Sequence, residues 1–308
     1  MGTTYHIKVV SEEIDSDELK VDVEKQLAHL NQVFSTYIPH SEISQLNREH
    51  GNLMVSEELM KVLSLSDEIH RRSKGAFDPT VGPLVELWGF GPSGPRDGVP
   101  SDFDIRKALA LSGFENVFLR DNSIEKPEGM VIDLSAIAKG YAVDVISELL
   151  DGMGEHQYMV EIGGEVRAKG YNDRRNLWQI GIEAPDENSR RLLRVVPIKN
   201  MAMATSGDYR NFFNFRGQAY SHTLNPNTGW PVSHNMASVT VLHPTAGYAD
   251  GLATAFSVMG PTATMEFAEA NKLLVLAIIR EEERLTEITS SELDRYLAGV
   301  AEERKHNL

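Results

Sequence analysis

The sequence contains no cysteine among its 308 residues. Disulfides, thiolate nucleophiles and cysteine-ligated zinc are therefore excluded. Its ten histidines are scattered, and none form a pair at metal-ligand spacing. The G-x-x-x-x-G-K-[ST] phosphate loop, the H-E-x-x-H zinc motif and the G-x-S-x-G nucleophile turn are also missing, which excludes three common catalytic frameworks.

Long apolar runs and an excess of basic residues are absent as well. The longest apolar run, 273–279, is far shorter than the ~20 residues of a membrane helix, and it predicts a buried strand. A net charge of -15 argues against a duplex-binding surface, but a local site for an anionic small ligand stays open. With 41% hydrophobic and 24% charged residues, the composition is typical of a globular protein of one large or two smaller domains.

Apolar periodicity predicts a mixture of helices and strands. Helices are expected at 16–34, 57–73, 136–150, 249–259 and from 261 to about 270. Strands are expected at 5–10, 158–162, 165–168, 178–183, 193–198, 219–224, 238–242 and 273–279. Because several strands follow one another between 158 and 242 without a helix, we expect antiparallel pairing and an α+β fold. Beyond Arg280 we expect a short strand and a terminal helix.

Residues 89–94 match G-x-G-x-x-G, the pattern of a dinucleotide-binding turn. That turn must follow a strand and open a helix, whereas Pro92 and Pro95 disfavour a helix start here. We therefore interpret 89–101 as a surface loop.

Two other segments combine glycine, aspartate and small residues. Residues 75–83 follow a helix end, where Gly75 suits a left-handed cap, and composition alone favours a simple helix-exit loop. Residues 132–141 read as a strand end turning into a helix, whose N-terminus, helped by Lys139, suits a phosphate. The alternative is that Asp133 or Ser135 only caps this helix.

Two further segments leave similar alternatives. Gly163-Gly164, within 161–165, marks either a hairpin turn or a point where a ligand meets the backbone. Asp250 and Thr254 are four residues apart on a helix, so that their oxygens share a face and form a hard donor set of the kind that Mg²⁺ binds. Alternatively, Asp250 caps the helix and Thr254 bonds back to a carbonyl.

The order of these segments, with Tyr37 in 34–37 and the stretches 206–210 and 221–232, resembles the ApbE flavin transferase family from Met1 to about Ile279. The resemblance implies largely antiparallel sheets with packed helices in a T-fold-related architecture. It also implies one domain over 1–308, with two lobes flanking an FAD site as a variant of this arrangement. The implied activity is transfer of FMN from FAD to a threonine hydroxyl of an acceptor protein, with Mg²⁺ and release of AMP.

The resemblance also assigns roles to residues. His222 matches a proposed base, and the metal ligands map to the Ala136 carbonyl and the Asp250 and Thr254 side chains. The FAD contacts map to Met1, Tyr37, Ala76, Phe77, Asp78, Asp133, Lys139 and Leu224. Ala253 stands where some relatives carry a further acidic residue, so we expect one more water on the metal. Ca²⁺ or Mn²⁺ are alternatives to Mg²⁺.

The family's acceptors are redox subunits of the Nqr and Rnf type that carry an Asp-x-x-Thr motif. Because the family's Met-Gly-Thr follows a lipoprotein signal, the resemblance implies a periplasmic protein anchored to the inner membrane by lipid in its precursor. Two alternatives share the FAD site. One is a metal-dependent FAD pyrophosphatase that yields FMN and AMP, and the other is a flavin-binding protein without turnover.

Overall fold

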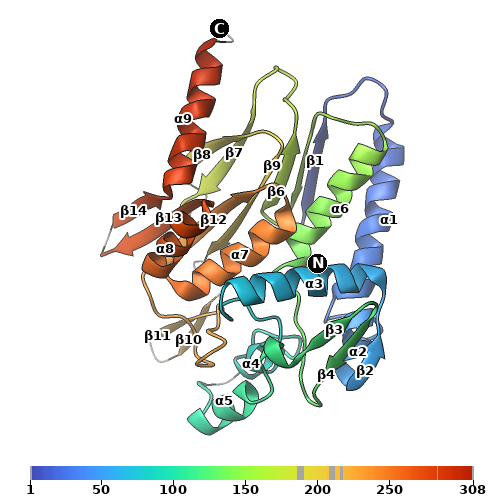
Figure 1. The fold of residues 1–308 in the computed structure, drawn as a ribbon, viewed down its shortest axis with the longest axis vertical. Coiled ribbons are helices and arrows are strands. Elements are labelled where there is room, and N and C mark those ends of the chain that lie inside the picture. Colours follow the sequence, from blue (N-terminus) through green and yellow to red (C-terminus); the bar gives the residue numbers. More distant parts are fainter. Residues whose placement is uncertain are drawn as a thin grey trace.

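The computed structural model describes residues 2–96, 98–185, 191–207, 212–215, 218–282 and 284–306. Its centre is a seven-stranded sheet in the order β1-β5-β6-β9-β12-β13-β14, with every neighbouring pair antiparallel (Figure 1). The α+β class predicted from the sequence is confirmed. The strands are β1 (Tyr5–Val9), β5 (Tyr158–Ile162), β6 (Glu165–Lys169), β9 (Met201–Gly207), β12 (Met236–His243), β13 (Leu274–Glu281) and β14 (Arg284–Thr289).

Helices cover one face of this sheet. Alternate residues of the central strands, such as Ala202, Ala204, Val275 and Ala277, face the helices and are buried in the main core. The helix α7 is buried along almost its whole length, which explains its nearly continuous apolar and small-residue sequence. The helices on this side are α1 (Ser16–Phe34), α3 (Glu57–Arg72), α6 (Ala138–Gly152), α7 (Ala246–Met259) and α8 (Pro261–Asn271).

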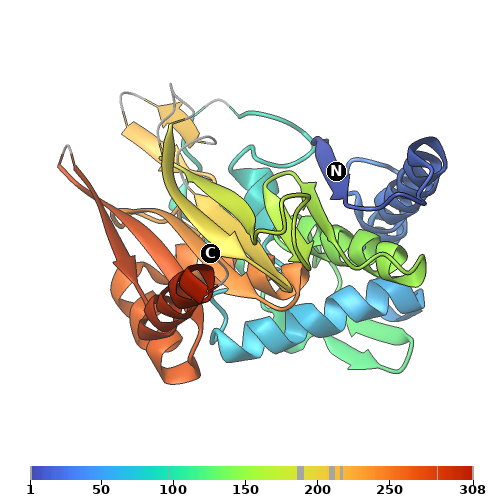
Figure 2. The same ribbon diagram turned by 90° about the horizontal axis from the view of Figure 1, so that it is seen from above.

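A hairpin of β7 (Trp178–Glu183) and β8 (Leu192–Ile198), together with α9 (Ser291–His306), covers the other face. Trp178, Ile180 and Ile182 pack with Met203 and Leu276 of the main sheet in a second core. Seen from above, the yellow hairpin and the helices α3 and α6 lie on opposite sides of the main sheet (Figure 2). The remaining elements are smaller: α2 (Glu42–Arg48), α4 (Gly82–Leu87), α5 (Asp102–Leu109), β2 (Gly51–Met54), β3 (Phe118–Arg120), β4 (Ser123–Lys126), β10 (Phe212–Phe215) and β11 (Gln218–Ser221).

All five predicted helices are confirmed to within a few residues, as are β14 and α9 beyond Arg280. The strand predicted at 219–224 is too long, because β11 ends at Ser221 and Leu224 forms only an isolated bridge with Pro231. The prediction omitted α2, α4, α5, β2, β3, β4, β9 and β10. These elements are short, and β9 reads MAMATSG, a composition with weak β propensity that burial in the sheet overrides.

Residues 89–94 follow α4 rather than a strand, so the loop interpretation of the G-x-G-x-x-G match is confirmed. Within the described ranges, no helix combines the length and the apolar character that crossing a membrane requires.

Candidate active site

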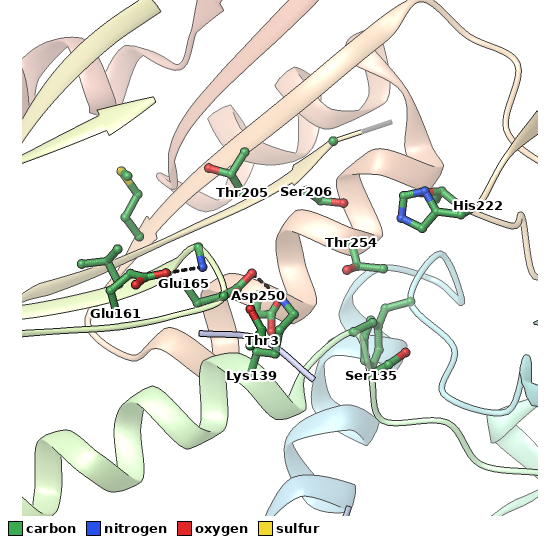
Figure 3. A pocket seen from close by; sticks show the side chains of 18 of the residues that line it. Thr3, Ser135, Lys139, Glu161, Glu165, Thr205, Ser206, His222, Asp250 and Thr254 are labelled. Carbon is green, nitrogen blue, oxygen red and sulfur yellow. Dashed lines mark hydrogen bonds and ion pairs between the residues drawn. The ribbon is translucent and has the colours of Figure 1, made fainter. Parts of the chain in front are cut away.

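A cavity of about 910 Å³ opens where strands of the main sheet meet the start of α6, the second turn of α7 and the strand β7. The cavity draws residues from segments that are far apart in the sequence, as Figure 3 shows for Thr3, Ser135, Thr205, His222 and Thr254. Of the residues singled out in the sequence, it is lined by Ala76, Phe77, Asp78, Asp133, Ala136, Lys139, His222, Leu224, Asp250 and Thr254.

One expected FAD contact, Tyr37, is not brought to this cavity in the described structure. Tyr37 follows α1, is 69% exposed and is not one of the lining residues. Met1 lies outside the described residues, as does part of the stretch 206–210.

The segment 132–141 forms a tight turn followed by α6. Asp133 Oδ1 accepts a hydrogen bond of 2.8 Å from the Ser135 amide, and the helix begins at Ala138 without any side-chain cap at its N-cap residue, Ile137. The interpretation that Asp133 or Ser135 caps this helix is therefore wrong. Lys139 is the second residue of α6, in its first turn as the sequence predicted.

Asp250 lies in the second turn of α7 and not at its end, so the interpretation of Asp250 as a cap is wrong too. It is buried, and its Oδ2 accepts a hydrogen bond of 3.0 Å from the Gly140 amide of α6. The cap of α7 is instead Asp144 of α6, which accepts from the amides of Ala246 at 2.9 Å and Gly247 at 2.8 Å. Sequence reasoning missed Asp144, because a cap supplied from another helix leaves no local pattern.

A buried charge cluster occupies one side of the cavity. Lys139 Nζ lies 2.5 Å from Glu165 Oε1 and 3.9 Å from Asp250 Oδ1, and His222 lies on the other side (Figure 3). Burial raises the pKa of Glu165 to about 8; the Asp250 charge adds to this rise, and Lys139 opposes it. Burial also raises the pKa of Asp250, while the Lys139 charge and the hydrogen bond from the Gly140 amide lower it by less. Two acidic side chains share one ammonium group here, and a bound cation would favour their ionised forms.

The donor set fits a divalent cation of the Mg²⁺ type. The Asp250 carboxylate, the Thr254 hydroxyl and the Ala136 residue line the same cavity, and together they can offer a carboxylate, a hydroxyl and a carbonyl oxygen. The short contact of Lys139 with Glu165 directs its ammonium away from Asp250 Oδ1, which at 3.9 Å is beyond hydrogen-bond distance.

Glu165 was named in the sequence only as the end of the segment 161–165, and its pairing with Lys139 was not foreseen. Its Oε2 is buried and has no hydrogen-bond partner among the described residues. The preceding glycines form the β5–β6 turn, with φ of +62° at Gly163 and +104° at Gly164. The hairpin interpretation is confirmed. The turn also lines the cavity, and contact of a ligand with its backbone stays a prediction.

His222 directly follows β11, and the backbone after this strand holds its side chain at the cavity. Thr223 donates its amide to Ser221 Oγ at 2.9 Å, and Val232 donates its amide to the Thr223 carbonyl at 3.0 Å. The His222 ring meets Phe90 edge-on, with centroids 6.4 Å apart. His222 thus lies between Ser221 and Thr223, which are bonded to each other, and Thr223 is bonded in turn to Val232.

One group of side chains with metal-binding chemistry was found among the described residues outside the predicted metal site: His70, Asp78 and Glu115. His70 Nδ1 forms a hydrogen bond of 2.9 Å with the Phe77 carbonyl. The two carboxylate oxygens of Asp78 accept hydrogen bonds from the amides of Thr80 and Phe114. The two buried members of the group, His70 and Asp78, therefore stabilise the 75–83 loop.

Known proteins are similar to this chain over most of its length. The chain is 40% identical over 304 residues to the FAD:protein FMN transferase of Vibrio cholerae, covering 97% of this chain and 91% of the relative. It is 39% identical over 303 residues to the protein of the same name from Haemophilus influenzae, with coverage of 94% and 88%.

Solved structures show the same fold. The flavin transferase ApbE from Vibrio cholerae superposes with a TM-score of 0.88 at 39% identity, over 96% of both chains. The apo form of the Pseudomonas stutzeri flavinyl transferase ApbE superposes with a TM-score of 0.89 at 35% identity, over 96% of this chain and 94% of that chain. The ApbE family profile matches residues 1–279, the extent expected from the motifs. This chain belongs to the ApbE family.

Proposed function

We propose that the protein transfers FMN from FAD to a hydroxyl group of an acceptor protein. The observation that carries the proposal is the convergence in one cavity of Lys139, Asp250, Thr254 and His222. The cavity therefore combines a phosphate-binding helix start, a hard oxygen donor set and an imidazole. The relatives named FAD:protein FMN transferase support this assignment. We further propose that the whole chain acts as one unit around this cavity.

In the proposed site, Asp250, Thr254 and the Ala136 carbonyl hold Mg²⁺, with Ca²⁺ or Mn²⁺ as alternatives. When bound, the metal neutralises negative charge on the pyrophosphate of FAD. Lys139 and the positive end of the α6 helix dipole hold the same phosphates. Asp133, Leu224 and the loop with Ala76, Phe77 and Asp78 hold the rest of FAD; Tyr37 and Met1 remain proposed contacts on resemblance alone.

His222 acts as the general base in this proposal. It accepts the proton of the acceptor threonine, whose oxygen forms a bond to the phosphorus nearer the riboflavin. The bond from that phosphorus to the bridging oxygen breaks, and AMP leaves with the electron pair. FMN stays on the acceptor as a phosphoester.

The proposed acceptors are redox subunits of the Nqr or Rnf type with an Asp-x-x-Thr motif, and the proposed location is the periplasmic side of the inner membrane, with a lipid anchor in the precursor. Family membership supports both proposals.

Product analysis tests the activity. The protein is incubated with FAD and Mg²⁺, with and without an acceptor domain, and the nucleotides are separated by chromatography. Release of AMP that requires the acceptor and stops in EDTA is the expected result. Release of AMP and free FMN at the same rate without acceptor would make the protein a pyrophosphatase, and intact FAD throughout would leave a binding protein.

A further inference from the structure

The two edges of the β7–β8 hairpin differ. The outer edge of β8 is covered by α9, where Tyr296 Oη donates a hydrogen bond of 3.0 Å to the Pro197 carbonyl. The edge of β7 instead borders the active-site cavity, which is lined by Gln179, Gly181 and their neighbours along the strand. β7 pairs with β8 and with no other strand in the described part of the chain.

The register shows which way the backbone groups of β7 point. Gln179 pairs with Pro197, which has no N–H and whose carbonyl turns away from β7 to reach Tyr296. In an antiparallel ladder, both members of a pair either exchange hydrogen bonds or point their backbone groups outward. Gln179 and Pro197 are therefore an outward-pointing pair. Gly181 and Val195, two residues along, are a pair of the same kind.

Gln179 and Gly181 thus present two N–H and two C=O groups to the cavity side. In the described ranges, no hydrogen bond joins these backbone groups to another element. The Gln179 side chain does not cover them, because its Nε2 donates back to the Leu177 carbonyl at 2.9 Å. Gly181 has no side chain, and the buried Ile180 and Ile182 hold the strand firmly on the second core.

An open, rigid edge of this kind is unusual, because edge strands are normally protected by charge, proline, bulges or a covering element. On the β8 side, Pro197 and α9 supply this protection. The edge of β7 lacks such protection where the strand meets the cavity. A bulge follows only further along, at Ile182–Glu183.

We propose that the open edge of β7 binds the acceptor protein as an added β-strand. This inference rests on the proposed function, which requires a polypeptide to bring a threonine hydroxyl to the cavity. Alternating N–H and C=O groups at strand spacing match another backbone, and alternate side chains of an added strand point the same way. One side chain of the added strand enters the cavity. Main-chain hydrogen bonds with β7 hold the adjacent acceptor residues, whatever their amino-acid type.

Proline substitutions test the proposal. Gln179→Pro removes an outward N–H on the β7 edge without removing a β7–β8 hydrogen bond. Val195→Pro makes the same change on the opposite, outward side of β8 and is the matched control. At saturating FAD, we expect Gln179→Pro to lower kcat/KM for the acceptor domain about tenfold relative to Val195→Pro, with KM for FAD equal in both.

Equal kcat/KM for the acceptor in the two variants would overturn the edge proposal alone, as would a parallel rise in KM for FAD. If the parent protein labels no acceptor, the proposed function fails and the edge proposal fails with it.

Amide hydrogen exchange in the parent protein provides a second test that does not depend on the folding of a variant. An acceptor domain whose threonine is replaced by valine should protect the amides of Gln179 and Gly181 but not that of Val195. Unchanged exchange at Gln179 and Gly181 with the acceptor bound would overturn the proposal.

Discussion

The carboxylate of Asp250 accepts a hydrogen bond of 3.0 Å from the amide of Gly140, across 110 residues of sequence. This bond joins the second turn of α7 to the first turn of α6 and brings the two segments with the strongest chemical signal to one place. The contact is also close. A Cβ on Gly140 would lie 2.7 Å from Asp250 Cβ and closer still to the Ala246 carbonyl oxygen.

Gly140→Ala is therefore expected to push α6 and α7 apart. We predict a loss of about 1–3 kcal/mol in the free energy of unfolding, together with reduced transfer activity, because backbone atoms must move. The measurement is denaturant unfolding. Gly152→Ala, at the other end of α6 with nothing within 4 Å of the new Cβ, is the matched control and should be neutral or slightly stabilising. Equal stability of the two variants would contradict the packing account.

Asp250→Asn keeps an acceptor for the Gly140 amide but removes the charge. Transfer should fall on the order of 100-fold or more, because Asp250 is the only carboxylate among the three proposed metal ligands. Stability should change little, since burial already disfavours this charge. Steady-state transfer and Mg²⁺ titration are the measurements. Asp151→Asn, whose carboxylate pairs with Lys169 at 2.9 Å, is the control. Parent-like transfer by Asp250→Asn would remove Asp250 from the metal site.

His222→Ala should lower kcat about 100-fold or more, the usual contribution of a general base, while the Kd for FAD changes only a few-fold. Single-turnover kinetics and flavin fluorescence separate the two effects. A large loss of FAD affinity with unchanged turnover would assign His222 to binding rather than proton transfer.

His243 gives a pH prediction away from the cavity. Burial lowers the pKa of His243, which stacks on Tyr248 with centroids 4.4 Å apart and whose Nδ1 lies 3.2 Å from the Thr245 amide that donates to it. Since the folded pKa is below the unfolded value of about 6.5, the unfolded state binds the proton more readily. The contribution of neutral His243 to the free energy of unfolding is therefore present above about pH 6.5 and is lost as the pH falls through the lowered pKa of the folded state.

The free energy of unfolding of the parent should therefore decrease relative to His243→Gln as the pH falls from 7 to 5. Urea unfolding at several pH values measures this difference. A difference that stays constant over the range would show that His243 keeps its ordinary pKa in the folded protein.

The sequence predicted those parts of the fold that have a long repeating pattern. The α1 and α3 helices are capped by Asp15 and Ser56, whose side chains accept hydrogen bonds from first-turn amides, and both helices were located correctly. Short elements such as α4, which starts at Gly82-Pro83, carry too few turns for a periodic signal. β9 was missed because its position in the sheet, rather than its own propensity, makes it a strand.

The site was predictable where chemistry is local to a segment. Lys139 at a helix start and Asp250 with Thr254 on one helix face could be found from spacing alone. The contacts of Glu165 with Lys139, of Asp144 with the start of α7, and of Gly140 with Asp250 could not, because each joins separate elements. No pattern within one segment records such pairings.

The most direct test of the proposed activity is the mass of an acceptor domain bearing an Asp-x-x-Thr motif after incubation with this protein, FAD and Mg²⁺. The account predicts a mass gain equal to FMN on the acceptor threonine, and no gain in EDTA or when that threonine is replaced by valine. An unchanged acceptor mass while FAD is converted to free FMN and AMP, or stays intact, would contradict it.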